Sequence, residues 1–214
     1  MMSRPSMLPR RVLMPATSVR LLLAACAASL LALVLGAARP AAAAEATATG
    51  DAAACPALLR YTVNRLQDES PQPLCQYAGK VLLVVNTASY CGFTPQYEGL
   101  EAMSAKYASR GLVVLGFPSN DFGQQEPGDS RQIADFCFNT YGVKFPMFSK
   151  TKVVGKDMSP FFAALVQASG EAPRWNFHKY LIDREGRVVA SFASKVTPSS
   201  RELVDAVDKA LAAR

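Results

Sequence analysis

Two short runs of branched apolar residues, separated by one helix-length segment, restrict this chain to very few folds. Residues 81–85 read Val-Leu-Leu-Val-Val, and residues 112–117 read Leu-Val-Val-Leu-Gly-Phe. Continuous apolar runs of this length are typical of strands that are buried on both faces of a sheet. Between the two runs, Leu100, Met103 and Tyr107 recur at helical spacing. The pattern therefore predicts a strand, a helix and a second, parallel strand, which is the βαβ unit of a layered α/β protein.

The other periodic segments are bounded by turn residues, N-capping residues or prolines. The expected elements are, in chain order, a hairpin of residues 61–66 and 72–74, helices that start at Asp129 or Ser130 and at Ser159-Pro160, a second hairpin of residues 180–182 and 188–190, and a final helix that starts at Thr197-Pro198. Buried strands that alternate with helices favour the α/β class. We expect a central mixed sheet flanked by helices, with an N-terminal β-hairpin, in the order of a thioredoxin-like fold.

The formal net charge of +6 is concentrated in the N-terminal segment. Residues 1–44 contain five arginines and no acidic residue, whereas the rest of the chain carries 18 basic and 17 acidic residues. An apolar run at residues 21–38 follows four of the arginines, and Ala42-Ala43-Ala44 supplies the small residues that a signal peptidase accepts. The sequence predicts a signal peptide at 1–44, a flexible leader at 45–54 and a single domain at 55–214.

A signal peptide places the protein in the periplasm, with no stable membrane span after cleavage. The N-terminal segment also fits an uncleaved anchor or a lipidated one. The apolar run is just long enough to cross a bilayer of about 30 Å, and Leu23-Ala24-Ala25-Cys26 is similar to a lipidation site. The nearly neutral remainder has no basic stripe and no phosphate-binding glycine loop, so no nucleic-acid partner is expected.

Cys91 is the first candidate for chemistry, because it lies between a predicted buried strand and the following helix. Reactive groups collect at the carboxyl ends of the strands in α/β sheets. A helix N-terminus also stabilises a thiolate and so lowers the pKa of a cysteine. The alternative is a small, unreactive core residue. Thr94 stands where a dithiol-exchange motif would need its second cysteine, which argues against that function.

Three segments of the chain resemble the signature motifs of the glutathione peroxidase family. They are residues 84–97 around Cys91, residues 116–128, which end in Gln-Gln-Glu-Pro-Gly, and Trp175-Asn176-Phe177. Together with smaller matches at Lys144-Phe145-Pro146 and Asp183, the resemblance runs through nearly all of residues 58–211. It implies a thioredoxin-like fold and an enzyme that reduces hydrogen peroxide and organic hydroperoxides.

The resemblance assigns Cys91 as the peroxidatic residue and Gln125, Trp175 and Asn176 as its partners in a catalytic tetrad. The amides and the indole are neutral N–H donors, which favour a thiolate over a thiol. They can also stabilise the negative charge that develops on a leaving oxygen. Attack on the O–O bond then gives a sulfenic acid. Taken singly, a core tryptophan, a loop-capping glutamine and a turn asparagine would be ordinary structural residues.

Cys137 resembles the resolving cysteine of the thioredoxin-dependent members, because residues 136–142 resemble the segment that carries it. It lies 46 residues after Cys91 on a predicted helix. A disulfide needs Cα atoms within about 7 Å, so the resolving role predicts local unwinding of that helix. The alternative is a core cysteine beside Ile133 and Phe136. Ser119 stands where many relatives have another cysteine, which leaves Cys137 as the resolver within the motif region.

Cys55 and Cys75 flank the predicted first hairpin. In an exported protein the leading interpretation of such a pair is a structural disulfide. The alternative is that one of them is a second resolving thiol.

His178, the only histidine, allows a cysteine-hydrolase hypothesis with Cys91 and Asn176. On a strand, however, His178 and Asn176 would share a face and could not align as base and orienter. One histidine and scattered cysteines lack the ligand spacing of a metal site, and we expect no metal and no other cofactor.

The expected partners are a peroxide substrate and a thioredoxin-like reductant or glutathione. The segment between Phe162 and Trp175 lacks the long insertion that family members use for subunit contacts and glutathione binding. This shortness implies a monomer and favours a dithiol reductant. The alternative function is a non-catalytic, thioredoxin-like redox-sensing or binding module.

Overall fold

The computed structural model of the chain describes residues 55–213. The predicted signal peptide at 1–44 and the leader at 45–54 lie outside the described residues. Within the part that is described, no helix is long and apolar enough to cross a membrane.

A four-stranded mixed sheet with the strand order β4-β3-β5-β6 forms the centre of this domain. Strand β3 (Val81–Thr87) pairs in parallel with β4 (Leu112–Pro118). Strand β5 (Lys179–Ile182) is antiparallel to β3, and β6 (Val188–Phe192) is antiparallel to β5. All seven residues of β3 are buried, as the uninterrupted apolar run predicts. The expected mixed sheet is therefore confirmed.

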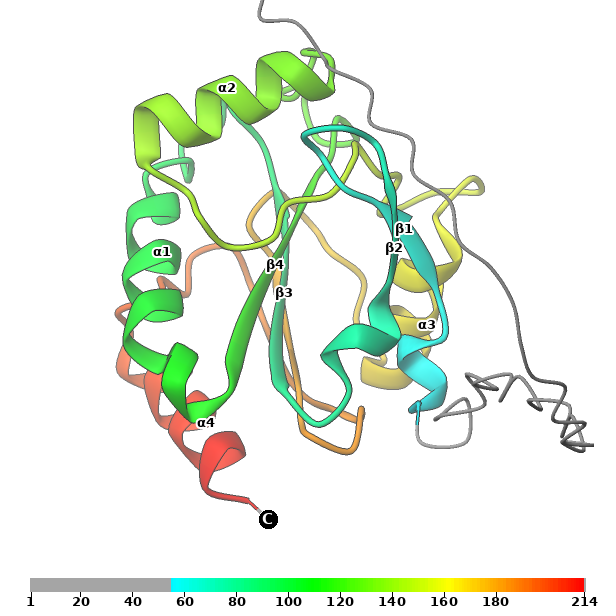
Figure 1. Cartoon of the computed structure of the whole chain (residues 1–214). Coiled ribbons are helices and arrows are strands. Elements are labelled where there is room, and N and C mark those ends of the chain that lie inside the picture. Colours follow the sequence, from blue (N-terminus) through cyan, green and yellow to red (C-terminus); the bar gives the residue numbers. More distant parts are fainter. Residues whose placement is uncertain (1–54, 214) are drawn as a thin grey trace, which may run out of the picture. The chain divides into compact units, whose positions relative to one another are not determined.

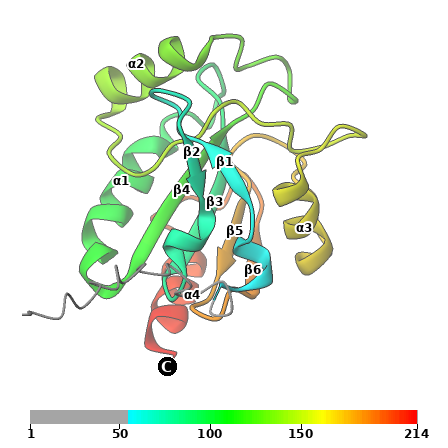
Figure 2. The same ribbon diagram turned by 45° about the vertical axis from the view of Figure 1, so that its right-hand side comes forward.

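Helices cover both faces of the sheet (Figure 1). The four α-helices are α1 (Gln96–Tyr107), α2 (Ser130–Tyr141), α3 (Pro160–Ser169) and α4 (Arg201–Ala212), and three short 3₁₀ helices span Ala57–Leu59, Leu74–Tyr77 and Ala108–Arg110. Helices α1 and α4 lie on one face and α3 on the other, whereas α2 lies beyond the edge at which β3 and β4 end (Figures 1 and 2). Each face has its own apolar cluster, because successive side chains of a strand point to opposite faces.

The observed helix starts agree with the capping residues at α2 and α3 but not at α4. A capping box formed by Asp129 and Gln132 begins α2, and the Ser159 hydroxyl caps α3. The expectation that Thr197-Pro198 opens the last helix is wrong, because the Ser200 hydroxyl accepts the hydrogen bond from the N–H of Leu203 instead. The Pro198 ring packs against α1, so this proline belongs to the preceding connection.

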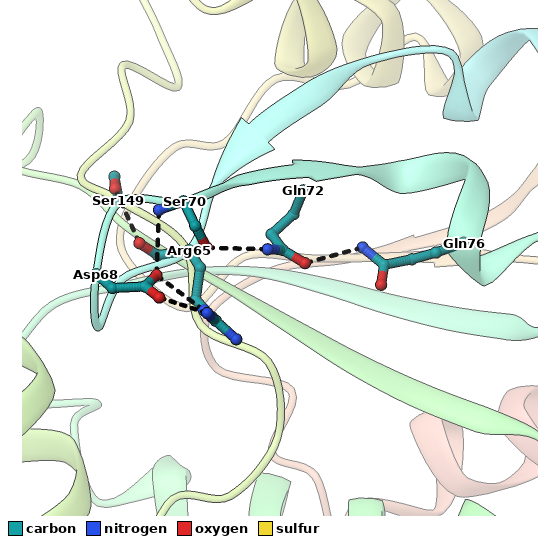
Figure 3. A network of polar contacts seen from close by, with 6 residues as sticks. All are labelled: Arg65, Asp68, Ser70, Gln72, Gln76 and Ser149. Carbon is teal, nitrogen blue, oxygen red and sulfur yellow. Dashed lines mark hydrogen bonds and ion pairs between the residues drawn. The ribbon is translucent and has the colours of Figure 1, made fainter. Parts of the chain in front are cut away.

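The N-terminal hairpin is present, with a first strand shorter than predicted and a second strand that lies one residue earlier. Strands β1 (Thr62–Asn64) and β2 (Pro71–Pro73) form their own antiparallel pair. The Asp68 carboxylate organises the connecting turn, because it accepts hydrogen bonds from the Arg65 guanidinium at 2.9 Å and from the Ser70 N–H at 3.1 Å (Figure 3). The Arg65 side chain is the main reason that the pKa of Asp68 is lowered. Side-chain contacts therefore define this turn.

Cys55 and Cys75 form a disulfide between the first described residue and the second 3₁₀ helix. Their Cα atoms are 5.5 Å apart, and the bond spans 20 positions of sequence. Arg60 adds a hydrogen bond from its guanidinium to the Cys55 carbonyl at 3.1 Å. The N-terminal segment is thus tied to the hairpin covalently.

Replacing both Cys55 and Cys75 with serine should lower the free energy of unfolding by roughly 3 kcal/mol, because a loop of this length loses its closure constraint in the unfolded chain. For a domain of this size the loss corresponds to about 6–12 °C in melting temperature. Calorimetry of the double variant and the oxidised wild type measures the difference. Equal melting temperatures would contradict a stabilising role.

Candidate active site

Three loops meet at one edge of the sheet. Strands β3 and β4 are parallel and end at this edge, and β5, which is antiparallel to β3, begins there. Cys91 follows β3, Gln125 follows β4, and Trp175-Asn176 precedes β5. Three segments that are far apart in the sequence are therefore brought to one place by the sheet topology alone.

Cys91 is a free, buried thiol in the turn between β3 and α1, with 7% of its surface exposed. Thr94 braces this turn: its hydroxyl accepts a hydrogen bond from the Cys91 N–H at 3.0 Å and donates one to the Ala88 carbonyl at 2.8 Å. The N–H of Phe93 donates to the Cys91 sulfur at 3.4 Å. The sulfur thus has a backbone N–H donor aimed at it, in the turn directly before α1.

Gln125 is joined to this turn through the backbone, because the Tyr90 N–H donates to the Gln125 carbonyl at 3.0 Å. The preceding residues, Gly123 and Gln124, both have positive φ angles, of 61° and 51°. Glycine adopts this conformation freely, whereas glutamine adopts it rarely. The resulting bend sets Gly123 against the Trp175 ring, since a Cβ built on it would lie 3.5 Å from Trp175 Cη2.

Trp175 and Asn176 occupy a turn directly before β5, beside Gln125. The Trp175 ring is 39% exposed and lies 5.8 Å from the Phe122 ring, measured between centroids. Asn176 is fully buried, and its side-chain amide donates to Gln125 Oε1 at 3.0 Å. The structure thus brings Gln125 and Asn176 into hydrogen-bond contact, with Trp175 next to Asn176 in the same turn, and the Tyr90 hydrogen bond links them to the turn that holds the fourth predicted tetrad residue, Cys91.

Asn86 is a site residue that the sequence analysis missed. It is buried near the end of β3, and its side chain donates to the Trp175 carbonyl at 3.2 Å and accepts from the His178 N–H at 3.0 Å. Its backbone carbonyl accepts the Phe177 N–H at 2.6 Å. The sequence did contain a signal for this role, namely a polar residue directly after five apolar ones. An amide at such a buried position must have hydrogen-bond partners.

Cys137 lies in the middle of α2 and is 2% exposed. It is a free thiol and belongs to the same apolar cluster as Cys91. Burial is the main cause that raises the pKa of Cys137 to about 11. The thiol is therefore protonated while α2 is in place, and its resolving role stays a prediction.

The contacts of the His178 side chain are not with Cys91. Its Nε2 atom lies 2.9 Å from the Ser191 hydroxyl, and its ring packs on Tyr180, which belongs to the apolar cluster on the opposite face from Cys91. The expected strand through Asn176 and His178 is wrong, because Phe177 has a φ of 65° and reverses the chain direction. The hydrolase hypothesis needs His178 as a general base for Cys91 and Asn176 as the residue that orients it. The His178 ring instead bonds Ser191, and the Asn176 amide bonds Gln125.

Comparison with known proteins identifies the family. A sequence model described as glutathione peroxidase matches residues 58–166. The chain is 47% identical over 161 residues to the hydroperoxy fatty acid reductase gpx1 of Synechocystis sp., which covers 71% of this chain and 94% of that protein. It is 47% identical over 140 residues to the glutathione peroxidase-like peroxiredoxin gpx1 of Schizosaccharomyces pombe, covering 64% of this chain and 89% of that protein.

Solved structures agree with this result. The crystal structure of T. cruzi GPX1 is 29% identical with a TM-score of 0.57, and the match covers 72% of this chain and 94% of that one. A thioredoxin-family thiol:disulfide interchange protein from Chlorobium tepidum TLS, at 19% identity and a TM-score of 0.53 over 71% of this chain and 92% of that one, shares the fold alone. The thioredoxin-like fold is thereby confirmed. From its motifs, its fold and these relatives, the chain belongs to the glutathione peroxidase family and is an oxidoreductase of the peroxidase class.

Proposed function

We propose that this peroxidase reduces hydrogen peroxide and organic hydroperoxides through the thiolate of Cys91. The observation that carries the proposal is the continuous link from the Cys91 turn through Tyr90 to Gln125, and from Gln125 to Asn176, with Trp175 alongside. These side chains carry neutral N–H donors, and the hydrogen-bonded links hold them next to the turn that carries Cys91. Such donors stabilise a thiolate and a leaving oxygen without attracting anions in general.

In the first step, the Cys91 thiolate attacks one peroxide oxygen. The S–O bond forms as the O–O bond breaks, and the departing oxygen takes up a proton to leave as water or an alcohol. The sulfur is thereby oxidised to a sulfenic acid. The name of the Synechocystis relative, a hydroperoxy fatty acid reductase, supports organic hydroperoxides among the substrates.

In the second step, Cys137 attacks the Cys91 sulfenic acid. The S–S bond forms, the S–O bond breaks, and the hydroxide that leaves combines with the thiol proton to give water. A dithiol reductant of the thioredoxin type then reduces the disulfide. The name of the S. pombe relative, a peroxiredoxin, supports a dithiol over glutathione.

The second step calls for local opening of α2, because the Cys137 thiol is buried in its closed position. Only Ile133 and Cys137 are buried among its 12 residues, whereas Ala134, Phe136 and Tyr141 pack partly buried against the core. Phe138, the next residue, is 64% exposed. Segments with few buried apolar contacts open locally at a small fraction of the global unfolding free energy.

Peptide mapping of the peroxide-treated protein by mass spectrometry tests this cycle. We expect a Cys91–Cys137 disulfide after one equivalent of peroxide. A Cys91–Cys75 bridge would assign the resolving role to the N-terminal pair instead. Steady-state peroxide consumption with thioredoxin and with glutathione then identifies the reductant class, and no consumption with either would leave the redox-sensing module as the function.

Asn176→Ala should slow sulfenic acid formation by about 10- to 100-fold, because one donor is lost and Gln125 loses the partner that orients it. Single-turnover kinetics of Cys91 oxidation measure this step alone. Asn64→Ala, at an exposed asparagine on β1, is the matched control and should keep the wild-type rate. A rate for Asn176→Ala within twofold of the wild type would remove Asn176 from the site.

The proposal extends to a monomeric enzyme that acts after export. Support comes from the signal-like residues 1–44 and from the Cys55–Cys75 disulfide, which is typical of oxidising compartments. Only five residues, 170–174, separate α3 from Trp175, which is too short for an added contact element. N-terminal sequencing of the secreted protein and its size in solution test the two statements.

A further inference from the structure

Glu126 is a fully buried carboxyl group that the proposed reaction does not use. It follows Gln125 in the loop between β4 and α2, and none of its surface is exposed. Its backbone N–H is fixed by the Asn120 side chain at 2.8 Å. Among the described residues, neither carboxyl oxygen has a hydrogen-bond partner of regular geometry. A carboxylate in such a place is costly unless it is protonated.

The carboxyl group lies where the Cys91 turn faces α2. A pocket of about 490 Å³ is lined by Ser89, Tyr90 and Glu126 on one side and by Ile133 and Phe136 of α2 on the other, and the Tyr90 and Phe136 rings lie 6.2 Å apart between centroids. The Ser89 hydroxyl is itself buried without a regular partner. Opening of α2 would therefore expose Glu126 to water together with Cys137.

The charged and titratable groups around Glu126 do not neutralise it. Burial has the largest effect and raises the pKa of Glu126, whereas the Ser89 hydroxyl and N–H, and then the charge of Lys150, lower it. The Lys150 ammonium group bonds the Pro127 carbonyl at 3.3 Å and forms no ion pair with the carboxylate. Asp135 lines the same pocket from α2 and has the same charge sign. Negative charge on Glu126 also raises the pKa of Tyr97 on α1 and that of Cys137 on α2.

We propose that Glu126 is a positioning residue for the resolving step: ionisation of its carboxyl group favours the open arrangement in which Cys137 reaches Cys91. The role rests on the proposed resolving function of Cys137. When α2 is closed, a charged Glu126 is buried, with support only from the Ser89 hydroxyl and N–H and with no ion pair. When α2 is open, the same charge is solvated. Ionisation therefore shifts the equilibrium toward opening.

The direction of the pH dependence follows from the two states. Burial raises the pKa of Glu126 to about 7 in the closed state, against an ordinary value of 4.5 that applies once the group is solvated. Between these two pKa values the closed state binds more protons than the open state. The equilibrium constant for closing therefore falls as the pH rises, by up to about tenfold per pH unit. From pH 5 to pH 8 the open fraction should increase by roughly 50- to 100-fold.

Hydrogen exchange of the reduced protein tests this proposal without any peroxide. Protection factors for the amides of α2, corrected for intrinsic exchange, are measured from pH 5 to pH 8. In the wild type these protection factors should fall by roughly 50- to 100-fold over this range. Glu126→Gln mimics the protonated acid, so its α2 amides should keep the protection seen in the wild type at pH 5.

Asp135→Asn is the matched control, because it removes a second carboxyl group from the wall of the same pocket. It should retain the wild-type fall in protection. A flat pH series in the wild type would overturn the proposal, whatever the variants do, and so would a full pH-dependent fall in Glu126→Gln. Failure of the resolving function is recognised separately, as absence of a Cys91–Cys137 disulfide in the peptide map.

Discussion

Cys91→Ser should lower steady-state peroxide turnover by on the order of a thousandfold or more. A serine hydroxyl does not ionise near neutral pH, whereas the proposed attack on the peroxide needs a thiolate at the sulfur that accepts the Phe93 N–H. The side chains of Gln125 and Asn176 keep each other in place, so the variant loses the nucleophile without losing the donors. Peroxide consumption with a thioredoxin-type reductant measures the loss.

The melting temperature of Cys91→Ser is the control, because it shows whether the variant is still folded. It should stay close to that of the wild type, because the change is isosteric and Thr94 still braces the turn. Residual turnover within tenfold of the wild type, in a folded variant, would show that another thiol reacts with peroxide.

Cys137→Ser should reduce turnover with a dithiol reductant by about 100- to 1000-fold while leaving the first oxidation of Cys91 intact. A tethered thiol attacks at an effective concentration in the millimolar range, whereas a free reductant at about 10 μM must find the buried sulfenic acid from solution. A burst of one equivalent of peroxide, followed by a slow steady state, is the expected time course. A sulfenic acid reagent should label Cys91 in this variant.

The double variant of Cys55 and Cys75 is the control for this prediction. Below its melting temperature it should turn over at the wild-type rate, because neither residue has a role in the cycle. If the double variant shows the burst and the slow steady state while Cys137→Ser turns over normally, the N-terminal pair supplies the resolving thiol.

The parts of the fold that the sequence predicted are those decided by local chemistry. Strand β3 contains the uninterrupted apolar run of residues 81–85, and α2 starts at the capping box of Asp129. The start of α4 differs from its prediction because Pro198 packs against α1, a contact between distant segments. Sequence patterns alone do not contain such contacts.

In the candidate site, too, the sequence predicted the residues but not the contacts between distant segments. The resemblance supplied the identity of Gln125, Trp175 and Asn176, but not which of them bond to one another. The reversal at Phe177 has no local signal, because a positive φ in a non-glycine residue is imposed by its surroundings, here by the hydrogen bonds to Asn86. The burial of Glu126 has no signal in the sequence either, since it depends on how distant segments pack around the loop.

The disulfide at the N-terminus has a topological consequence for redox cycling. The stretch between Cys55 and Cys75 ends before the stretch between Cys91 and Cys137 begins, so the two loops neither interleave nor nest. Closing one loop places no threading constraint on the other. In the proposed cycle, the bond between Cys91 and Cys137 can therefore form and break at each turnover while the ring closed by Cys55 and Cys75 stays intact.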